Sequence, residues 1–267
     1  MLVAVIADFQ FFGLQRCFEP FAYAGNSVTV VCIHVVSVTL QRVSVQCAQF
    51  TDANRYTARM SQYFEIHPQN PQPRLLRRAV EILERDGVIV YPTDSCYALG
   101  CRIDSKAAQE RISRIRQTGP DHHFTLVCPD LSSIATYAKV GNAEYRMLKG
   151  LTPGPFTFLL PATRELPRRL HHPKRRTIGI RVPEYPVVTG LLEMLGEPIL
   201  SSTLILPEDE LPMTEPEDIR ARLEHQVDAV VDGGHCGVEP TTVVDMTTQP
   251  PEIARRGREA ERATAWR

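Results

Sequence analysis

The stretch Gly87-Val-Ile-Val-Tyr-Pro-Thr-Asp-Ser-Cys-Tyr-Ala-Leu-Gly-Cys101 decides how this chain is expected to fold. Val88 to Tyr91 are apolar and rich in β-branched residues, which predicts a short buried strand. Pro92 ends that strand because it has no N–H to donate to a neighbouring strand. Small polar side chains follow at once, at Thr93 to Ser95. Such groups at the end of a core strand are typical of a ligand pocket, although they also cap backbone amides in ordinary turns.

Helical and strand-like periods alternate irregularly along the rest of the chain. Helices are predicted over 74–85, 105–116, 131–138, 142–149, 187–195 and 216–226. Strands are predicted over 64–66, 88–91, 124–128, 156–160, 178–182, 199–202, 229–231 and 242–244, with a last one around Ile253. This order indicates a single α/β domain with a twisted, mixed sheet and flanking helices.

Composition favours a soluble globular protein with an ordinary core. The chain has 267 residues, of which 43% are hydrophobic and 23% charged, and its formal net charge is −1. The charge is unevenly distributed, because fifteen Lys or Arg residues stand against six Asp or Glu between Arg102 and Arg181. This segment can present a positive surface to phosphates, or it can simply form solvated helix faces.

The seven cysteines show no Cys-x-x-Cys spacing and no dense disulfide framework. They are therefore interpreted as reduced thiols of a cytoplasmic protein. The apolar run from Val28 to Leu40 is too short to span a bilayer, and no membrane partner is expected.

Residues 1–59 differ from the rest of the chain. They contain no lysine and carry three of the seven cysteines. The first ten residues lack the basic region that a secretory signal needs. We expect residues 1–59 to be an N-terminal extension outside the domain, translated from upstream of a true start at Met60, with the domain spanning 60–267. A genuine N-terminal extension is the alternative.

Several common chemistries have no motif here. The chain contains neither a Gly-x-x-x-x-Gly-Lys-Ser/Thr loop for phosphates nor a Gly-x-Ser-x-Gly elbow for a nucleophilic serine. His122-His123 and His171-His172 are adjacent pairs, whose side chains diverge, so neither pair by itself predicts a metal site.

Further motifs carry a resemblance to a known family. They are Leu151-Thr-Pro-Gly-Pro-Phe-Thr-Phe-Leu-Leu160, Thr177-Ile-Gly-Ile-Arg-Val-Pro-Glu-Tyr-Pro186, Pro198-Ile-Leu-Ser-Ser-Thr203 and Pro240-Thr-Thr-Val-Val-Asp245. Together with the opening stretch, and in this order, they resemble the YrdC/YciO family, the threonylcarbamoyl-AMP synthase fold. The resemblance covers roughly residues 65 to 257 and implies a basic concave cavity. Arg114-Ile-Arg-Gln117 and Phe124-Thr-Leu126 are similar to the YciO branch.

The resemblance implies a reaction in which L-threonine, bicarbonate and ATP give threonylcarbamoyl-AMP and pyrophosphate, for modification of adenosine 37 of tRNA. Mg²⁺ would accompany the triphosphate. Thr93 would bind the threonine, and Arg181 would clamp its carboxylate with the fork of its guanidinium. The implied catalytic residues are Arg116, Arg181 and Thr203, and the implied nucleotide-binding residues are Arg116, Thr118, Thr203, Thr241, Thr242 and Arg255. For Arg181 a plain surface ion pair is the alternative.

Two positions depart from the synthase pattern. The family's Lys-x-Arg pair reads Arg116-Gln117-Thr118 here, so an arginine is replaced by an uncharged threonine. Its Ser-x-Asn pair reads Thr203-Leu204-Ile205, so an amide is replaced by a hydrocarbon. Since one pre-organised donor is worth on the order of 10²–10³ in rate, weak activity is expected unless other cations compensate.

Two other functions compete with this enzyme. The chain can be a double-stranded RNA- or tRNA-binding protein without catalysis, because A-form RNA is recognised largely through phosphate and 2′-hydroxyl contacts. The exposed charge for this would come from Arg164, Arg168, Arg169, Lys174, Arg175 and Arg176. A different adenylating or carboxylating activity on another amine is the third possibility.

Overall fold

The strand predicted from the opening stretch lies inside the sheet and is covered on both sides. In a computed structural model of the protein, which describes residues 60–119, 124–172 and 174–265, it is strand β2, Ile89–Tyr91. Ile89 and Tyr91 pack into one hydrophobic cluster, whereas Val88 and Val90 pack into the other. Burial on both faces explains why the segment is continuously apolar instead of alternating.

The described residues form a ten-stranded sheet in the order β1-β8-β2-β3-β7-β4-β6-β5-β9-β10. Its other strands are β1 (Gln62–Glu65), β3 (Ala98–Arg102), β4 (Thr125–Val127), β5 (Phe156–Pro161), β6 (Thr177–Arg181), β7 (Ile199–Thr203), β8 (Ala229–Asp232), β9 (Thr242–Asp245) and β10 (Glu252–Arg255). The sheet is mixed: β2 pairs with β8 in parallel and with β3 antiparallel. The predicted fold class, an α/β domain with a mixed sheet, is confirmed.

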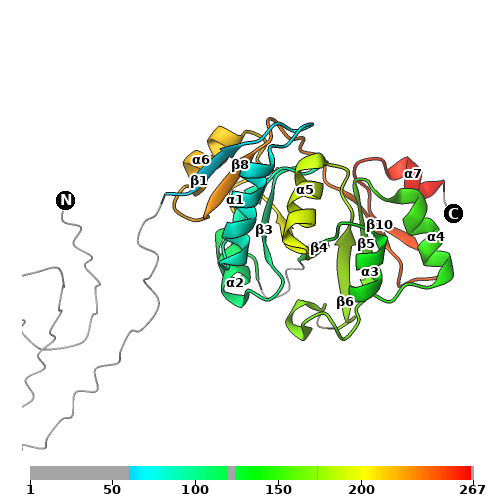
Figure 1. The fold of residues 1–267 in the computed structure, drawn as a ribbon. Coiled ribbons are helices and arrows are strands. Elements are labelled where there is room, and N and C mark those ends of the chain that lie inside the picture. The colour runs from blue at the N-terminus through cyan, green and yellow to red at the C-terminus, as the bar shows by residue number, and fades with distance from the viewer. Residues whose placement is uncertain (1–59, 120–123, 173, 266–267) are drawn as a thin grey trace, which may run out of the picture. The chain divides into compact units, whose positions relative to one another are not determined.

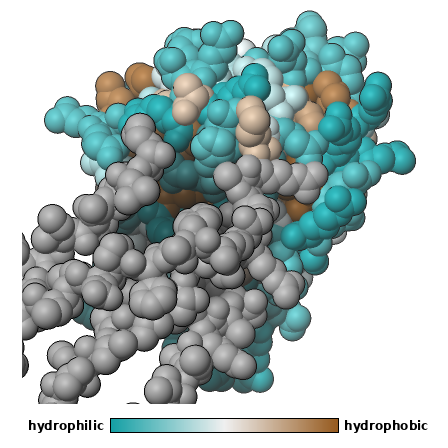
Figure 2. Space-filling model, turned by 90° about the vertical axis from the view of Figure 1, so that its left-hand side faces the viewer, coloured by the Kyte–Doolittle hydropathy of each residue, from teal (hydrophilic) through white to brown (hydrophobic). Residues whose placement is uncertain are grey.

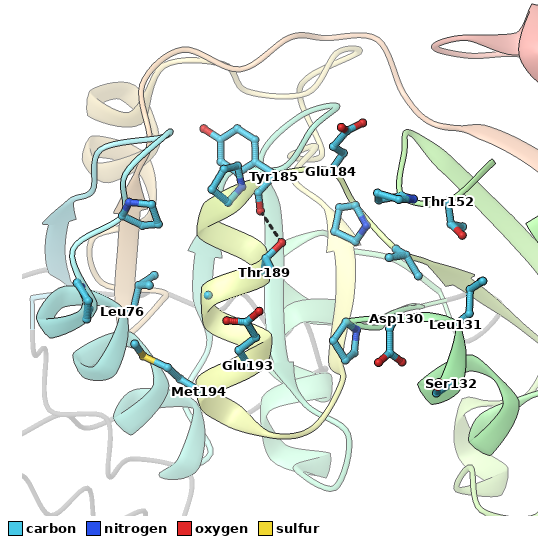
Figure 3. Close-up of a pocket in the computed structure, with 18 of the residues that line it drawn as sticks. Leu76, Asp130, Leu131, Ser132, Thr152, Glu184, Tyr185, Thr189, Glu193 and Met194 are labelled. Atoms are coloured by element: carbon cyan, nitrogen blue, oxygen red, sulfur yellow. Dashed lines mark hydrogen bonds between the residues drawn. The ribbon is translucent and has the colours of Figure 1, made fainter. Parts of the chain in front are cut away.

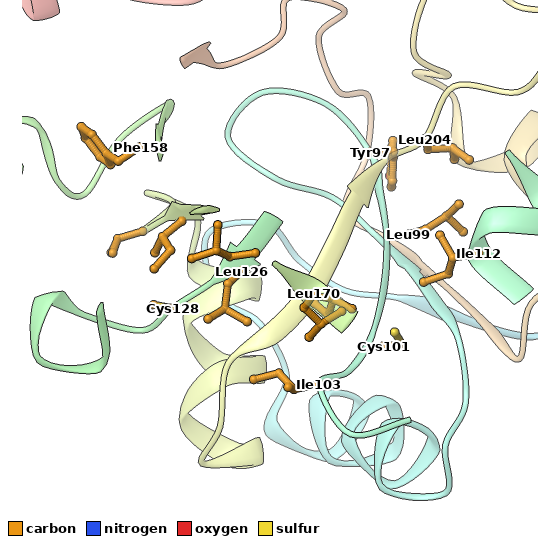
Figure 4. Packing of buried hydrophobic residues seen from close by; sticks show 14 of the residues in the cluster. Tyr97, Leu99, Cys101, Ile103, Ile112, Leu126, Cys128, Phe158, Leu170 and Leu204 are labelled. Carbon is orange, nitrogen blue, oxygen red and sulfur yellow. The ribbon is translucent and has the colours of Figure 1, made fainter. Parts of the chain in front are cut away.

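Helices cover both faces of this sheet (Figure 1). They are α1 (Pro73–Glu84), α2 (Lys106–Ile115), α3 (Leu131–Tyr137), α4 (Asn142–Leu151), α5 (Pro186–Leu195), α6 (Pro216–Leu223) and α7 (Ala260–Thr264), with a 3₁₀ turn over Arg168–Leu170. Helices α1 and α5 contribute to the cluster that contains Tyr91. The other five helices contribute to the second cluster, where Leu126, Leu99 and Ile112 are fully buried (Figure 4).

Two helix starts have well-known capping chemistry. Ser105 is the N-cap of α2, and its hydroxyl accepts a hydrogen bond from the N–H of Ala108 at 3.4 Å. Pro216 occupies the first turn of α6, where its missing N–H has no intrahelical partner to lose. Asp86 rather than Gly87 takes the left-handed conformation after α1, with φ of 61°.

The sequence prediction missed strand β3. Its residues, Ala-Leu-Gly-Cys-Arg, include poor strand formers, so the local pattern is weak. Pairing on both sides compensates, because β3 forms antiparallel ladders with β2 and β7. The short helix α7 and the 3₁₀ turn were not predicted either.

Gly100 of β3 lies beneath the ring of Tyr91. A Cβ atom at this position would lie 2.6 Å from Cε1 of Tyr91, which is closer than such atoms approach. The ring thereby extends across β3, and its hydroxyl donates a 2.7 Å hydrogen bond to Ser201 Oγ on β7. Glycine in a strand interior often marks such a close approach.

The space-filling view in Figure 2 shows a face that is mainly hydrophilic, with hydrophobic residues in small patches. Within the described ranges, no helix combines the length and apolar character needed to cross a membrane. The expected extension, residues 1–59, and the pair His122-His123 lie outside the described residues.

The double-sided core predicts a strong dependence of stability on Leu126. This side chain on β4 is fully buried, so Leu126→Ala should lower the free energy of unfolding by about 3 kcal/mol through lost burial and a residual cavity. Urea unfolding followed by circular dichroism measures the change. Leu211, which is 61% exposed, provides the matched control, and Leu211→Ala should change stability by less than about 0.5 kcal/mol. Equal losses in the two variants would contradict the described core.

Candidate functional site

The turn that follows β2 is held by the hydroxyl of Thr93. Thr93 Oγ1 donates to the carbonyl of Cys96 at 2.7 Å and accepts from the N–H groups of Ser95 and Cys96, both at 3.3 Å. It also lies 3.1 Å from Ser95 Oγ. The side chain is buried, and its hydrogen bonds close the turn on itself. Thr93 therefore shapes the turn, and the hydroxyl of Ser95 is presented beside it.

Arg181, at the end of β6, reaches this turn from a distant part of the sheet. Its guanidinium forms an ion pair with Asp94, and both side chains are only 9% exposed. Its Nη1 also lies 3.4 Å from Ser95 Oγ. The second carboxylate oxygen of Asp94 accepts from the N–H of Glu184 at 3.1 Å. Arg181 is thus a buried partner of the turn and not the surface ion pair of the alternative interpretation.

One donor of Arg181 is unused. Among the described residues, its buried Nε has no hydrogen-bond partner. A buried, unsatisfied donor on a charged group is costly, so it is an unusual feature that suits a ligand acceptor.

Arg116 comes to the same region from the end of α2. Its Nη1 donates to Ser202 Oγ and its Nε to the carbonyl of Ile205 at 3.3 Å, so the cation is fastened to β7 and the segment after it. The hydroxyl oxygen of Thr118, two residues on, is buried and lacks a described partner. Ile205, where the synthase pattern has an asparagine, contributes a backbone carbonyl to Arg116 instead of a side-chain amide.

The C-terminal strands bring in the remaining predicted residues. Thr241 Oγ1 lies 2.8 Å from Thr157 Oγ1, and Arg255 Nη2 donates to the carbonyl of Thr241 at 2.9 Å. Thr242 is fully buried, and its hydroxyl donates to the carbonyl of Arg258 at 2.9 Å. Thr242 therefore secures the backbone, whereas Arg255 and Thr241 form a separate polar pair.

The thiol of Cys96 is the common neighbour of these groups. It lies 3.7 Å from Ser95 Oγ, and it interacts with the hydroxyl of Thr203 and with the charge of Arg181. Arg116 and Arg255 also interact electrostatically with it. The charges of Arg116, Arg181 and Arg255 and the hydroxyl of Thr203 thus all act on the ionisation of Cys96, which follows the turn of Thr93.

Burial governs the ionisation of this cluster. Desolvation raises the pKa of the Cys96 thiol despite the nearby cations, so the thiol is neutral at pH 7. Desolvation also lowers the pKa of Arg116 and of Arg255. These guanidinium groups remain charged, since arginine is not deprotonated under physiological conditions. An anion placed here would meet cations in partly dehydrated surroundings, where electrostatic attraction is stronger than in water.

Sequence reasoning missed three contributors to the site. Cys96 lies in the opening stretch but carries no recognisable signal of its role. Ser202 binds Arg116 from the middle of a strand motif. Arg258, for which the sequence offered no signal, donates from Nη1 to the carbonyl of Asp94 at 2.8 Å and so ties the C-terminal segment to the turn.

The basic segment around residue 170 is only partly free. Arg169 donates to the carbonyls of Ile103 and Asp104 and to the side chain of Gln109, and it therefore acts as a structural clamp. Arg175 pairs with Asp245 at 3.2 Å. The other predicted cations, Arg164, Arg168, Lys174 and Arg176, are exposed.

In the described parts of the chain, no three or more His, Cys, Asp or Glu side chains cluster so that they could hold a metal ion. Asp94 is already committed to Arg181. The described residues therefore do not form a cage of the oxygen ligands that Mg²⁺ prefers.

The buried pair predicts a strong coupling between Asp94 and Arg181. Arg181→Met should lower the free energy of unfolding by about 3–5 kcal/mol because it leaves a buried carboxylate without its counter-charge. Combining it with Asp94→Asn should recover a large part of that loss. A double-mutant cycle in urea measures the coupling. Additive effects of the two substitutions would contradict a direct buried pair.

Comparisons with known proteins place the chain in a family. Residues 81–257 match the family model of Sua5, YciO and YrdC, which is described as "Telomere recombination". YciO of Escherichia coli is 55% identical over 198 residues, covering 74% of this chain and 96% of that protein. The crystal structure of E. coli YciO superposes with a TM-score of 0.72 over 74% of this chain and 97% of that one.

More distant relatives carry a named activity or ligand. Threonylcarbamoyl-AMP synthase of Klebsiella pneumoniae is 28% identical over 183 residues, covering 67% of this chain and 94% of that protein. The crystal structure of P. abyssi Sua5 complexed with L-threonine shares the fold with a TM-score of 0.69 at 22% identity, over 76% of this chain and 61% of that one. On the family match and the identity to YciO, the chain belongs to the Sua5/YciO/YrdC family.

Proposed function

We propose that this protein is a threonylcarbamoyl-AMP synthase-like enzyme of low activity. The observation that carries the proposal is Arg181, which Asp94 holds beside the turn of Thr93 and whose buried Nε is unused, while Arg116 and Arg255 act electrostatically on Cys96 of the same segment. Three cations beside a small polar turn suit a substrate set made of a carboxylate, a bicarbonate and a triphosphate. Relatives named as threonylcarbamoyl-AMP synthase and as an L-threonine complex support the choice of substrates.

In this proposal the amine of threonine first takes up the carbon of bicarbonate, releasing water and giving a carbamate. The carbamate oxygen then attacks the α-phosphorus of ATP, and pyrophosphate leaves with the electrons of the broken P–O bond. Arg181 binds the carboxylate of threonine through Nε, while Asp94 holds the guanidinium in place. The protein's contribution is positioning and neutralisation of charge on the α-phosphate of the transferred adenylyl group.

The low rate follows because some donors at the site are used by the protein itself and others are absent. Arg116 is bound to Ser202 and to the Ile205 carbonyl, so some of its donors serve the protein. Thr118 and Ile205 add no charge and no amide where the synthase pattern has both. The cations of Arg116 and Arg255 nevertheless provide a field that favours an anion.

The activity is tested by incubating the protein with ATP, bicarbonate and threonine and measuring pyrophosphate. Release of pyrophosphate should depend on threonine, and Arg181→Lys should reduce it on the order of 10²-fold because one fork of donors is lost. Arg222→Gln, which changes an exposed cation on α6, should leave the rate unchanged. A melting temperature separates loss of function from unfolding. Pyrophosphate release that is independent of threonine would refute the proposal.

Restoring the two missing donors should raise the rate. Thr118→Arg with Ile205→Asn is expected to increase threonine-dependent pyrophosphate release by about 10-fold or more, since each added donor faces developing charge. Thr118→Met with Ile205→Leu, which adds neither charge nor a hydrogen-bond donor, is the matched control. An unchanged rate in the restored variant would mean that these positions do not limit activity.

RNA binding without catalysis is a second candidate function. It is favoured by the four exposed cations Arg164, Arg168, Lys174 and Arg176, which are available to phosphates. On this reading Arg168→Gln with Lys174→Gln should weaken binding to a double-stranded RNA and lower the slope of log affinity against log salt by about 2. Arg74→Gln on α1 is the control. Filter binding at several salt concentrations gives both numbers, and unaltered slopes would exclude this surface.

A further inference from the structure

A large apolar groove crosses helix α5 and adjoins the site described above at Glu184, whose backbone N–H donates to Asp94. Its volume is about 1030 Å³, and none of the predicted site residues lines it. Figure 3 shows its walls: Leu76 of α1 on one side of α5, and Leu131 with Thr152 on the other. The volume is at the upper end of the range for ligand pockets, although the groove is open along its length.

Proline rings form much of the lining. The six are Pro71, Pro73, Pro129, Pro153, Pro183 and Pro186. Because each ring fixes its own backbone φ, this surface is pre-organised and loses little conformational freedom when a partner binds. Met194 on α5, 37% exposed, adds an adaptable apolar side chain.

The charges on the rim of the groove are mostly negative. Asp130, Glu184 and Glu193 line the groove, whereas Lys149 is the single cation among the described lining residues. No ion pair of Glu184 or Glu193 occurs within the described residues, and both are exposed. Anionic ligands such as nucleotides, nucleic acids or fatty acids would be repelled. A second copy of the chain is also disfavoured, because a two-fold contact would bring these carboxylates against their own copies.

Glu184 lies two residues before α5, and Glu193 lies in the last turn of α5. Seven helical residues at about 1.5 Å each and the two residues before them place the two backbones roughly 15 Å apart. An extended peptide covers this distance in four or five residues at about 3.3 Å each. Figure 3 shows Glu184 beyond the start of α5 and Glu193 toward its end, on the same side as the groove.

We infer that this groove binds an extended segment of a partner protein in which two basic residues flank a short apolar stretch. The apolar side chains would pack on the proline rings and Met194, and the basic residues would pair with Glu184 and Glu193. The inference is independent of the proposed synthase activity, since the two use different residues.

The test uses the full 267-residue chain and a fluorescein-labelled peptide with two lysines separated by leucine, proline and leucine. Fluorescence anisotropy should show saturable binding. The same peptide with glutamates in place of lysines, and a peptide with the two lysines adjacent, should each bind at least about 10-fold more weakly. Equal affinity for all three peptides, or no binding, would overturn the inference.

Variants of the protein locate the site. Glu184→Gln with Glu193→Gln should weaken binding of the lysine peptide by about 10-fold, and Met194→Gln by several-fold. Glu210→Gln, an exposed acidic position outside the groove, should have no effect. Circular dichroism confirms that the variants fold. Binding that survives the groove substitutions would overturn the inference, as would sedimentation showing that Met194 instead mediates self-association of the chain.

Discussion

The buried pair of Asp94 and Arg181 is the contact on which the candidate site depends. It joins the turn after β2 to the end of β6, although strands β3, β7 and β4 lie between them in the sheet. Without the guanidinium, the carboxylate of Asp94 would be buried with no counter-charge. Without the carboxylate, the guanidinium of Arg181 would likewise be a buried charge with no partner. The conformation of the Thr93 turn is therefore coupled to the register of a distant strand. Arg258 adds a second tie, from the C-terminal segment to the carbonyl of the same Asp94.

The same arrangement places positive charge where little water reaches it. The charges of Arg116, Arg181 and Arg255 all act on the thiol of Cys96, which burial keeps neutral. Each guanidinium is braced by protein acceptors: Ser202 for Arg116, Asp94 for Arg181 and the Thr241 carbonyl for Arg255. Bracing lowers the cost of reorganisation when an anion arrives, but it also uses donors that a substrate would need. The balance between the lower reorganisation cost and the loss of free donors decides whether such a site only binds its ligand or also catalyses a reaction.

Local sequence predicted much of the fold because the local signals were strong. β2 was identifiable from its apolar run, and α2 from the helical period of its residues. β3 was missed since its stability comes from pairing with β2 and β7, which no window of sequence contains. The sheet order likewise depends on contacts between distant segments. For the site, motifs indicated Thr93 and Arg181, but the partnership of Arg181 with Asp94 and the contribution of Arg258 arise only from the folded topology.

Gly100 links the packing of the sheet to the candidate site. Because it has no side chain, the Tyr91 ring can lie flat across β3 and reach Ser201 with its hydroxyl. Ser201 precedes Ser202 and Thr203, two residues that face Arg116 and Cys96. The Tyr91 ring thus fixes the distance between β2 and β7 across β3. A methyl group at position 100 would displace the Tyr91 ring. The displaced ring would shift Ser201 and, with it, the two following residues of the candidate site.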